Sequence, residues 1–138
     1  MPRREQVELL LHKASEDEAA LDILLASPAP PPAVVGFHAQ QAAEKLLKAA
    51  LRAARVEYPY THILDYLLRL LAKEGAEIPE GLREVRYLTA FAGRLRYEAL
   101  DEDLAPTMGL AQMRALIRDL RAWVEAFVEA RLGDQPLV

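Results

Sequence analysis

The segment GFHAQQAAEKLLKAAL, residues 36–51, has the pattern of an amphipathic helix. When residues 37–55 are projected onto a helix at 100° per residue, apolar and polar side chains separate onto opposite sides. The apolar side comprises Ala39, Ala42, Ala43, Leu46, Leu47, Ala49, Ala50, Ala53 and Ala54, and the polar side comprises His38, Gln41, Glu44, Lys45, Lys48, Arg52 and Arg55. Because alanine lets another helix backbone approach closely, the pattern predicts a helix at the centre of a bundle.

Prolines divide the rest of the chain, because proline inside a helix removes a hydrogen bond and clashes with the preceding turn. The apolar spacing between them predicts five helices: residues 3–26, residues 33–55, a third with Thr61 as its N-cap that stops at Gly75, residues 79–100, and a fifth that ends at Gly133. Short connections between long amphipathic helices make neighbours antiparallel. We therefore predict an all-α fold, an up-and-down four-helix bundle with an additional fifth helix, in a single domain over residues 1–138.

Composition restricts the class of protein. With 52% hydrophobic and 28% charged residues, the chain is typical of globular rather than disordered proteins. No segment approaches the roughly 20 apolar residues of a membrane span, and cysteine is absent, which favours a cytoplasmic protein without disulfides. A net charge of −4 argues against a general nucleic-acid coat protein, although a local basic face could still bind RNA. Most of the 17 basic residues are arginine and asparagine is absent, a bias compatible with a thermophilic source or with a high-GC genome.

Several chemistries lack their motifs. No glutamate has a histidine three residues later and HExxH is missing, so we predict no metal site. The glycines stand alone rather than in a phosphate-binding loop, which excludes ATP hydrolysis of the Walker kind at the motif level. We expect no cofactor.

Three pieces of the sequence carry a family resemblance. FHAQQAAEKLLKAAL, residues 37–51, resembles the signature helix of the HEPN family, a group of small helical domains named for their presence in higher eukaryotes and prokaryotes and for nucleotide binding. THILDYL, residues 61–67, resembles the family's Thr-His-x-Leu-x-x-Leu helix start, and Arg96 with Tyr97 resembles its Arg-Tyr pair. The resemblance covers about residues 5–130, and the three pieces stand in the expected order.

The resemblance implies a bundle that forms a homodimer, with two polar clefts facing each other. Many HEPN proteins are encoded beside a minimal nucleotidyltransferase, and some of these pairs act as toxin and antitoxin. In such pairs the HEPN member is a metal-independent ribonuclease, which the transferase silences by adding nucleotides.

The ribonuclease motif of the active family members is not found at its family position. It consists of arginine, four to six further residues and histidine, because cleavage through the 2′-hydroxyl needs a proton-transfer group beside a cation. Neither Arg94 nor Arg96 has a histidine at that distance, and the residues there are largely acidic. Arg55 and His62 satisfy the spacing but straddle a proline turn outside the motif position. The sequence therefore favours a protein that is not an enzyme, with no catalytic residue assigned.

Three functional interpretations follow. The first is a binding module whose cleft engages a nucleotide, RNA or a minimal nucleotidyltransferase partner in a toxin–antitoxin-like system, with Tyr97 as a hypothetical acceptor of a transferred nucleotide. The second is a metal-independent ribonuclease toxin with a non-standard active site. The third is a scaffold bundle whose polar stripes are solvated faces. The predicted nucleotide- or partner-binding residues are His38, Gln41, Lys45, His62, Arg94, Arg96 and Tyr97.

Overall fold

The computed structural model describes residues 1–92 and 108–133, which form five helices and no strand. Four are α-helices and one is a 3-10 helix: α1 (Arg3–Leu25), α2 (Pro32–Ala53), α3 (Leu64–Lys73), η1 (Glu80–Phe91) and α5 (Leu110–Gly133). The predicted all-α class is confirmed. None of the helices within these two ranges is long and apolar enough to cross a bilayer.

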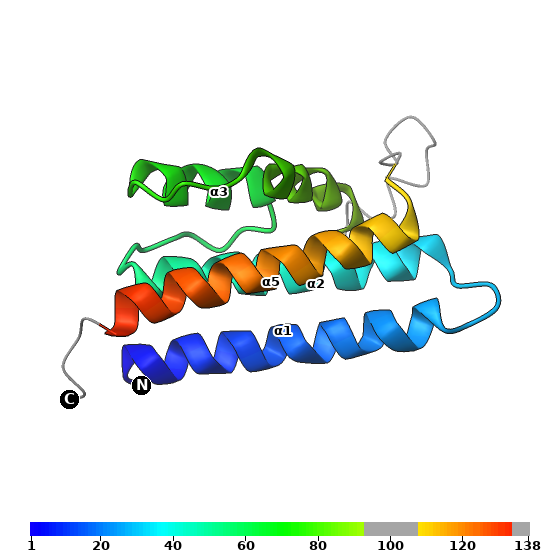
Figure 1. Ribbon diagram of the computed structural model, residues 1–138, viewed down its shortest axis with the longest axis horizontal. Helices are drawn as coiled ribbons and strands as arrows, with labels where there is room; N and C mark the ends of the chain where they lie inside the picture. The colour runs from blue at the N-terminus through cyan, green and yellow to red at the C-terminus, as the bar shows by residue number, and fades with distance from the viewer. Residues whose placement is uncertain (93–107, 134–138) are drawn as a thin grey trace.

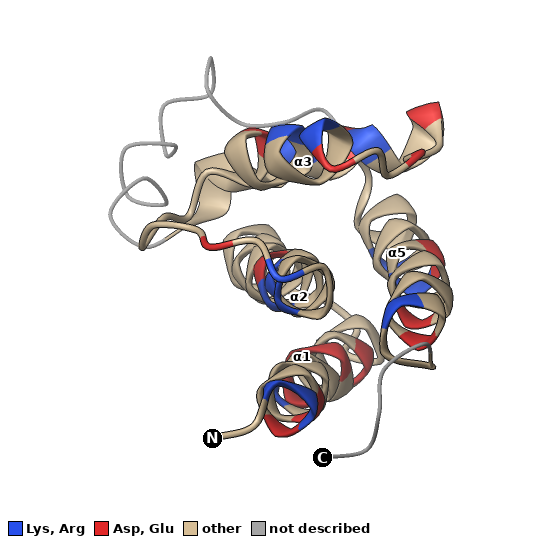
Figure 2. Ribbon diagram, turned by 90° about the vertical axis from the view of Figure 1, so that its left-hand side faces the viewer, with Lys and Arg blue, Asp and Glu red and all other residues tan. Residues whose placement is uncertain are grey.

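The helix α2 lies at the centre, as the alanine face predicts. It packs against each of the other four helices, and an end-on view shows it surrounded by α1, α3 and α5 (Figure 2). The helices α1, α2 and α5 run along the long axis of the molecule, while α3 and η1 form a layer on one side (Figure 1). Eight of the nine predicted apolar positions of α2 are buried, and Ala54, just past the end of the helix, is the partly exposed one.

The start of α3 differs from the prediction that Thr61 is its N-cap. The helix begins at Leu64, and the hydroxyl of Thr61 accepts a hydrogen bond from the backbone N–H of Ile63 at 3.1 Å. The first N–H of the helix, that of Leu64, instead donates to Oγ1 of Thr89 in η1 at 3.1 Å. A side chain distant in sequence thus supplies the cap, which the local sequence could not indicate.

The helix η1 was predicted as the first part of an α-helix over residues 79–100, and this prediction is wrong for Glu80–Phe91. Its buried side chains recur at every third residue: Leu82, Val85, Leu88 and Phe91. A helix with three residues per turn places such positions on one face, whereas an α-helix would rotate them progressively away from the core. The remainder of the predicted helix, from residue 93, lies outside the described residues.

Substitution of Gly36 by alanine is expected to destabilise the fold by about 1–2 kcal/mol. A Cβ atom at this position of α2 would lie 2.4 Å from Cδ1 of the buried Phe91 ring. The clash outweighs the gain of about 1 kcal/mol that alanine brings to a helix interior. Urea unfolding measures the change.

Gly81→Ala provides the control for Gly36→Ala, because an added Cβ there meets nothing within 4 Å. The double variant Gly36→Ala, Phe91→Leu should recover part of the loss, because it shortens the clashing side chain. Equal stability of the Gly36→Ala variant and the wild type would contradict this expectation, because the clash would then cost no more than the gain of about 1 kcal/mol from alanine.

Candidate functional site

Two buried carboxylates organise the polar side of α2. Asp17 reaches it from α1, and Glu44 lies on α2 itself. Their partners, together with the residues that continue the hydrogen-bond network, form what we name the polar cluster: Asp17, His38, Gln40, Gln41, Glu44, Lys45, Lys48, Tyr60 and His62. The cluster joins α1, α2 and the connection before α3.

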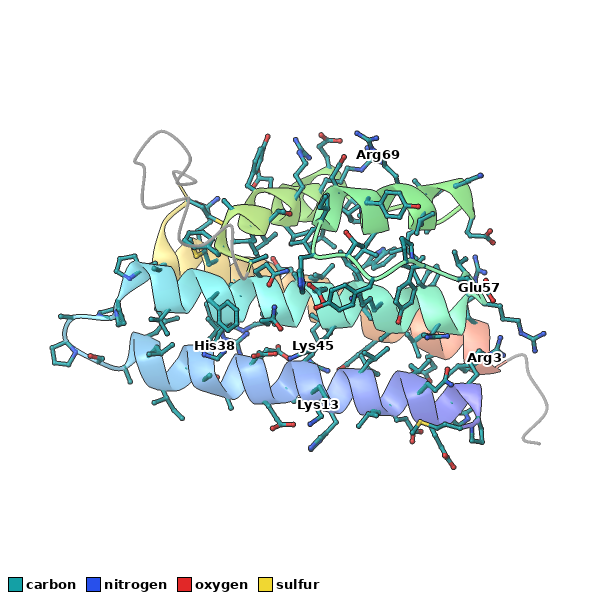
Figure 3. All side chains as sticks on the ribbon, turned by 180° about the vertical axis from the view of Figure 1, so that it is seen from behind. Arg3, Lys13, His38, Lys45, Glu57 and Arg69 are labelled. Carbon is teal, nitrogen blue, oxygen red and sulfur yellow. The ribbon has the colours of Figure 1, made fainter. Side chains whose placement is uncertain are left out.

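The carboxylate of Asp17 holds two predicted site residues. Nδ1 of His38 lies 3.0 Å from Oδ1, and Nζ of Lys45 donates to Oδ2 at 2.5 Å. His38 and Lys45 lie two helical turns apart on the side of α2 that faces α1 (Figure 3). Both side chains remain partly exposed while Asp17 is buried. The carboxylate therefore fixes a histidine and a lysine at the surface between the two helices.

The carboxylate of Glu44 holds a third predicted site residue, His62. Nδ1 of His62 lies 2.7 Å from Oε1, Nε2 of Gln40 donates to the same oxygen at 2.9 Å, and Nζ of Lys48 donates to Oε2 at 2.9 Å. Burial acts to raise the pKa of Glu44, but the hydrogen bonds from His62, Lys48 and Gln40 outweigh it and hold the pKa below its ordinary value. Glu44 is therefore an ionised carboxylate at neutral pH.

Gln41, the fourth predicted site residue, joins the Glu44 group through its neighbour. Its Nε2 donates to Oε1 of Gln40 at 2.7 Å, and Nε2 of Gln40 also reaches the backbone oxygen of His62 at 3.4 Å. Gln40 is completely buried. The amide pair thus ties α2 to the segment that carries His62.

Two tyrosine rings contact the Lys48 ammonium of the polar cluster. Nζ of Lys48 lies 5.6 Å from the ring centroids of both Tyr58 and Tyr60. The guanidinium of Arg52 lies 5.0 Å from the Tyr58 ring, and its Nε donates to the Tyr58 hydroxyl at 3.3 Å. Such cation–π contacts add a favourable electrostatic interaction to the hydrogen bond between the buried Lys48 ammonium and Glu44.

The structure brings together some of the predicted site residues. His38 and Lys45 share Asp17, while Gln41 and His62 belong to the Glu44 group. Arg94, Arg96 and Tyr97 lie outside the described residues, so their place relative to these groups stays a prediction.

The reading of the polar side of α2 as a solvated stripe is wrong at two positions, because Glu44 and Lys48 are buried. The predicted site residues also omit Asp17, Gln40 and Tyr60. The spacing of Gln40, Glu44 and Lys48 at intervals of four residues was a usable signal, since side chains so placed contact one another on a helix. For Asp17 no comparable local signal existed. Within residues 1–92 and 108–133, no three His, Asp or Glu side chains are grouped so that they could hold a metal ion.

The protein is thus a helical bundle whose central helix carries a polar, histidine-containing face held by buried carboxylates. The HEPN domain family model matches residues 7–131, so the chain belongs to the HEPN domain family. This confirms the resemblance seen in the sequence. No curated protein and no solved structure matches the chain.

Proposed function

We propose that this HEPN protein is a single-domain, cytoplasmic nucleotide- or partner-binding module that works with a minimal nucleotidyltransferase in a toxin–antitoxin-like system. The observation that carries the proposal is the pair His38 and Lys45, held at the surface by the buried Asp17. Pairing of nucleotidyltransferases with proteins of this family supports the choice of partner.

Lys45 is suited to bind a phosphate oxygen. Its ammonium has three N–H donors, and among the described residues only Asp17 accepts from it. Because one carboxylate fixes the ammonium, less side-chain entropy is lost when a phosphate binds. The partly exposed imidazole of His38 shares the Asp17 carboxylate with Lys45 and lies at the same surface.

In the proposed complex, Arg94 and Arg96 supply guanidinium forks for further phosphate oxygens, and Tyr97 contacts the nucleotide. The protein acts as a homodimer in which two such faces form one cleft. These features belong to the proposal, and they are suggested by the family pattern in residues 94–97.

Nucleotide binding is expected to stabilise the protein and to depend on Lys45. AMP, ADP or ATP at a hundredfold excess over its dissociation constant should add about 2.7 kcal/mol to the free energy of unfolding. Lys45→Gln should abolish most of this gain, because glutamine carries no charge. Thermal unfolding with and without each nucleotide measures the effect.

Lys13→Ala is the matched control for Lys45→Gln. Lys13 is an exposed lysine of α1 that points away from α2 (Figure 3), and it forms an ion pair at the surface with Glu16, at 3.7 Å. Its variant should keep the full nucleotide effect. The proposal fails if no nucleotide stabilises the wild type and no nucleotidyltransferase encoded beside the gene copurifies with it.

Incubation of the purified protein with mRNA in the absence of metal would distinguish a ribonuclease from the proposed binding module. Cleavage by the wild type that is lost in the double variant Arg94→Ala, Arg96→Ala would favour an enzyme over the binding module. Absence of cleavage by both proteins is the result that the proposal expects.

A further inference from the structure

A pocket of about 530 Å³ lies between η1 and α5, which pack against each other (Figure 1). This volume is within the range of small-ligand sites. The helix η1 contributes Leu82 and Glu84 to its lining, and α5 contributes Leu116, Asp119 and Trp123. The pocket shares no residue with the polar cluster, so a ligand bound here would be independent of the proposed function.

The α5 side of the pocket is one stripe of the helix. Gln112, Leu116, Asp119 and Trp123 follow one another at intervals of four, three and four residues, which places them on the same face. Leu116 is buried, and so is Leu82 on the opposite wall. The two leucines supply apolar surface against which the body of a ligand can pack.

The indole of Trp123 is fixed by contacts outside the pocket. Its Nε1 donates a hydrogen bond to the backbone oxygen of Glu77 at 3.2 Å. The ring stacks on Phe127 with centroids 5.2 Å apart and planes 18° from parallel, and the guanidinium of Arg131 lies 4.8 Å from the Phe127 ring. An aromatic ring that is already held in place loses little side-chain entropy when a ligand contacts it.

The charge of the pocket is negative. Glu84 and Asp119 line it from opposite walls, and none of the described residues that line it is a lysine, arginine or histidine. Within residues 1–92 and 108–133, neither carboxylate takes part in an ion pair or a hydrogen bond. Tryptophan is the side chain that attracts cations most strongly through its ring face. The lining therefore complements a positive charge attached to an apolar group.

We propose that this pocket binds a small organic cation, an ammonium or guanidinium group carried on an aromatic or aliphatic body. The body packs against Leu82 and Leu116, and the cationic group contacts the indole of Trp123 between the carboxylates of Glu84 and Asp119. An anionic ligand such as a nucleotide is disfavoured here, because both carboxylates would repel it.

The test uses the full chain and three probes that share an aromatic body but differ in charge: phenylbutylamine, phenylbutanol and phenylbutyrate. Trp123 is the only tryptophan of the chain, so its fluorescence reports directly on the pocket. The amine should give a saturable change and bind about tenfold more tightly than the alcohol, because the ring face and two carboxylates each favour the charge. The carboxylate probe should bind most weakly. Equal affinities for amine and alcohol, or no saturable change with the amine, would overturn the proposal.

The double variant Glu84→Gln, Asp119→Asn should bind the amine no more tightly than the alcohol. Both side chains are exposed, so the fold should tolerate the change. The matched control is Glu8→Gln, Glu129→Gln, which removes two exposed carboxylates of α1 and α5 outside the pocket and changes the net charge equally. The control should keep the preference for the amine. Loss of the preference in the control as well would mean that net charge attracts the amine, and would count against the site.

Ala115→Leu tests where the amine binds. Ala115 is an exposed residue of α5 that lines the pocket, and leucine there fills space while remaining a good helix former. The variant should weaken binding of both the amine and the alcohol, and unchanged affinities would place the probes elsewhere and contradict the proposal. A second copy of the chain is the competing occupant. Trp123 emission that shifts on dilution of the ligand-free protein, together with no response to the amine, would assign the pocket to that contact instead.

Discussion

Replacement of Glu44 by alanine is expected to lower the free energy of unfolding by about 3–5 kcal/mol. The change removes the acceptor of three hydrogen bonds, from His62, Gln40 and Lys48. Lys48, which is buried, is then left without its carboxylate partner. Equilibrium unfolding in urea at neutral pH measures the loss.

The same variant should change how stability depends on pH. The pKa of Glu44 is held below its ordinary value of 4.5 in the folded state. A group with a lowered folded pKa contributes stability that is fully present above its unfolded pKa and is lost as the pH falls through the folded pKa. The wild type should therefore lose stability on acidification below 4.5, and Glu44→Ala should show a smaller loss over this window.

Glu16→Ala is the matched control for Glu44→Ala. Glu16 is an exposed glutamate of α1 whose partners, His12 and Lys13, are also on the surface, so its loss should cost at most about 0.5 kcal/mol. The double variant Glu44→Leu, Lys48→Met should recover much of the stability, because it removes both charges rather than one. A loss below about 1 kcal/mol for Glu44→Ala would mean that water replaces the carboxylate, and that the cluster is not an organised buried site.

The central position of α2 could be predicted from the sequence because packing at the centre of a bundle requires small residues within the helix itself. A helix that is contacted on most sides needs small residues where backbones approach, and the alanines of residues 39–54 show this directly. The type of η1 was harder to predict. Apolar residues at intervals of three suit both an α-helix and a 3-10 helix over one or two turns, and only their strict repetition to Phe91 separates the two.

The charged residues of the candidate site were harder to place. Projection of a helix gives the direction of a side chain but not the element that covers it. Glu44 and Lys48 point to the polar side of α2, and they are buried where the segment of Tyr58, Tyr60 and His62 approaches that side. Buried charges need partners, and here some partners come from residues more than 15 positions away in the chain. Hydrophobic periodicity along the sequence does not indicate which distant residues pair with these buried charges.

The second large effect is expected at the contact between α1 and α5. The guanidinium of Arg121 on α5 lies 2.6 Å from Oε2 of the buried Glu18 and donates to the backbone oxygen of Leu11 at 3.0 Å and to Oγ of Ser15 at 2.9 Å. It also donates to Glu125 at 2.8 Å. Arg121→Ala should cost about 3 kcal/mol, because it leaves the buried carboxylate of Glu18 and the partly buried carbonyl of Leu11 without this donor. Thermal and urea unfolding both report the change.

The matched control is Arg118→Ala, which removes an exposed arginine from the same helix and should change stability by about 0.5 kcal/mol or less. Arg121→Lys separates charge from geometry, because lysine keeps the charge but cannot donate in a planar fork to several acceptors at once. A lysine variant as stable as the wild type would show that charge alone holds α1 to α5. A double-mutant cycle that combines Arg121→Ala with Glu18→Gln measures the coupling energy between the two side chains directly. Because Arg114 also approaches Glu18, at 3.5 Å, Glu18→Gln should cost less in the Arg121→Ala background than in the wild type but should not become neutral.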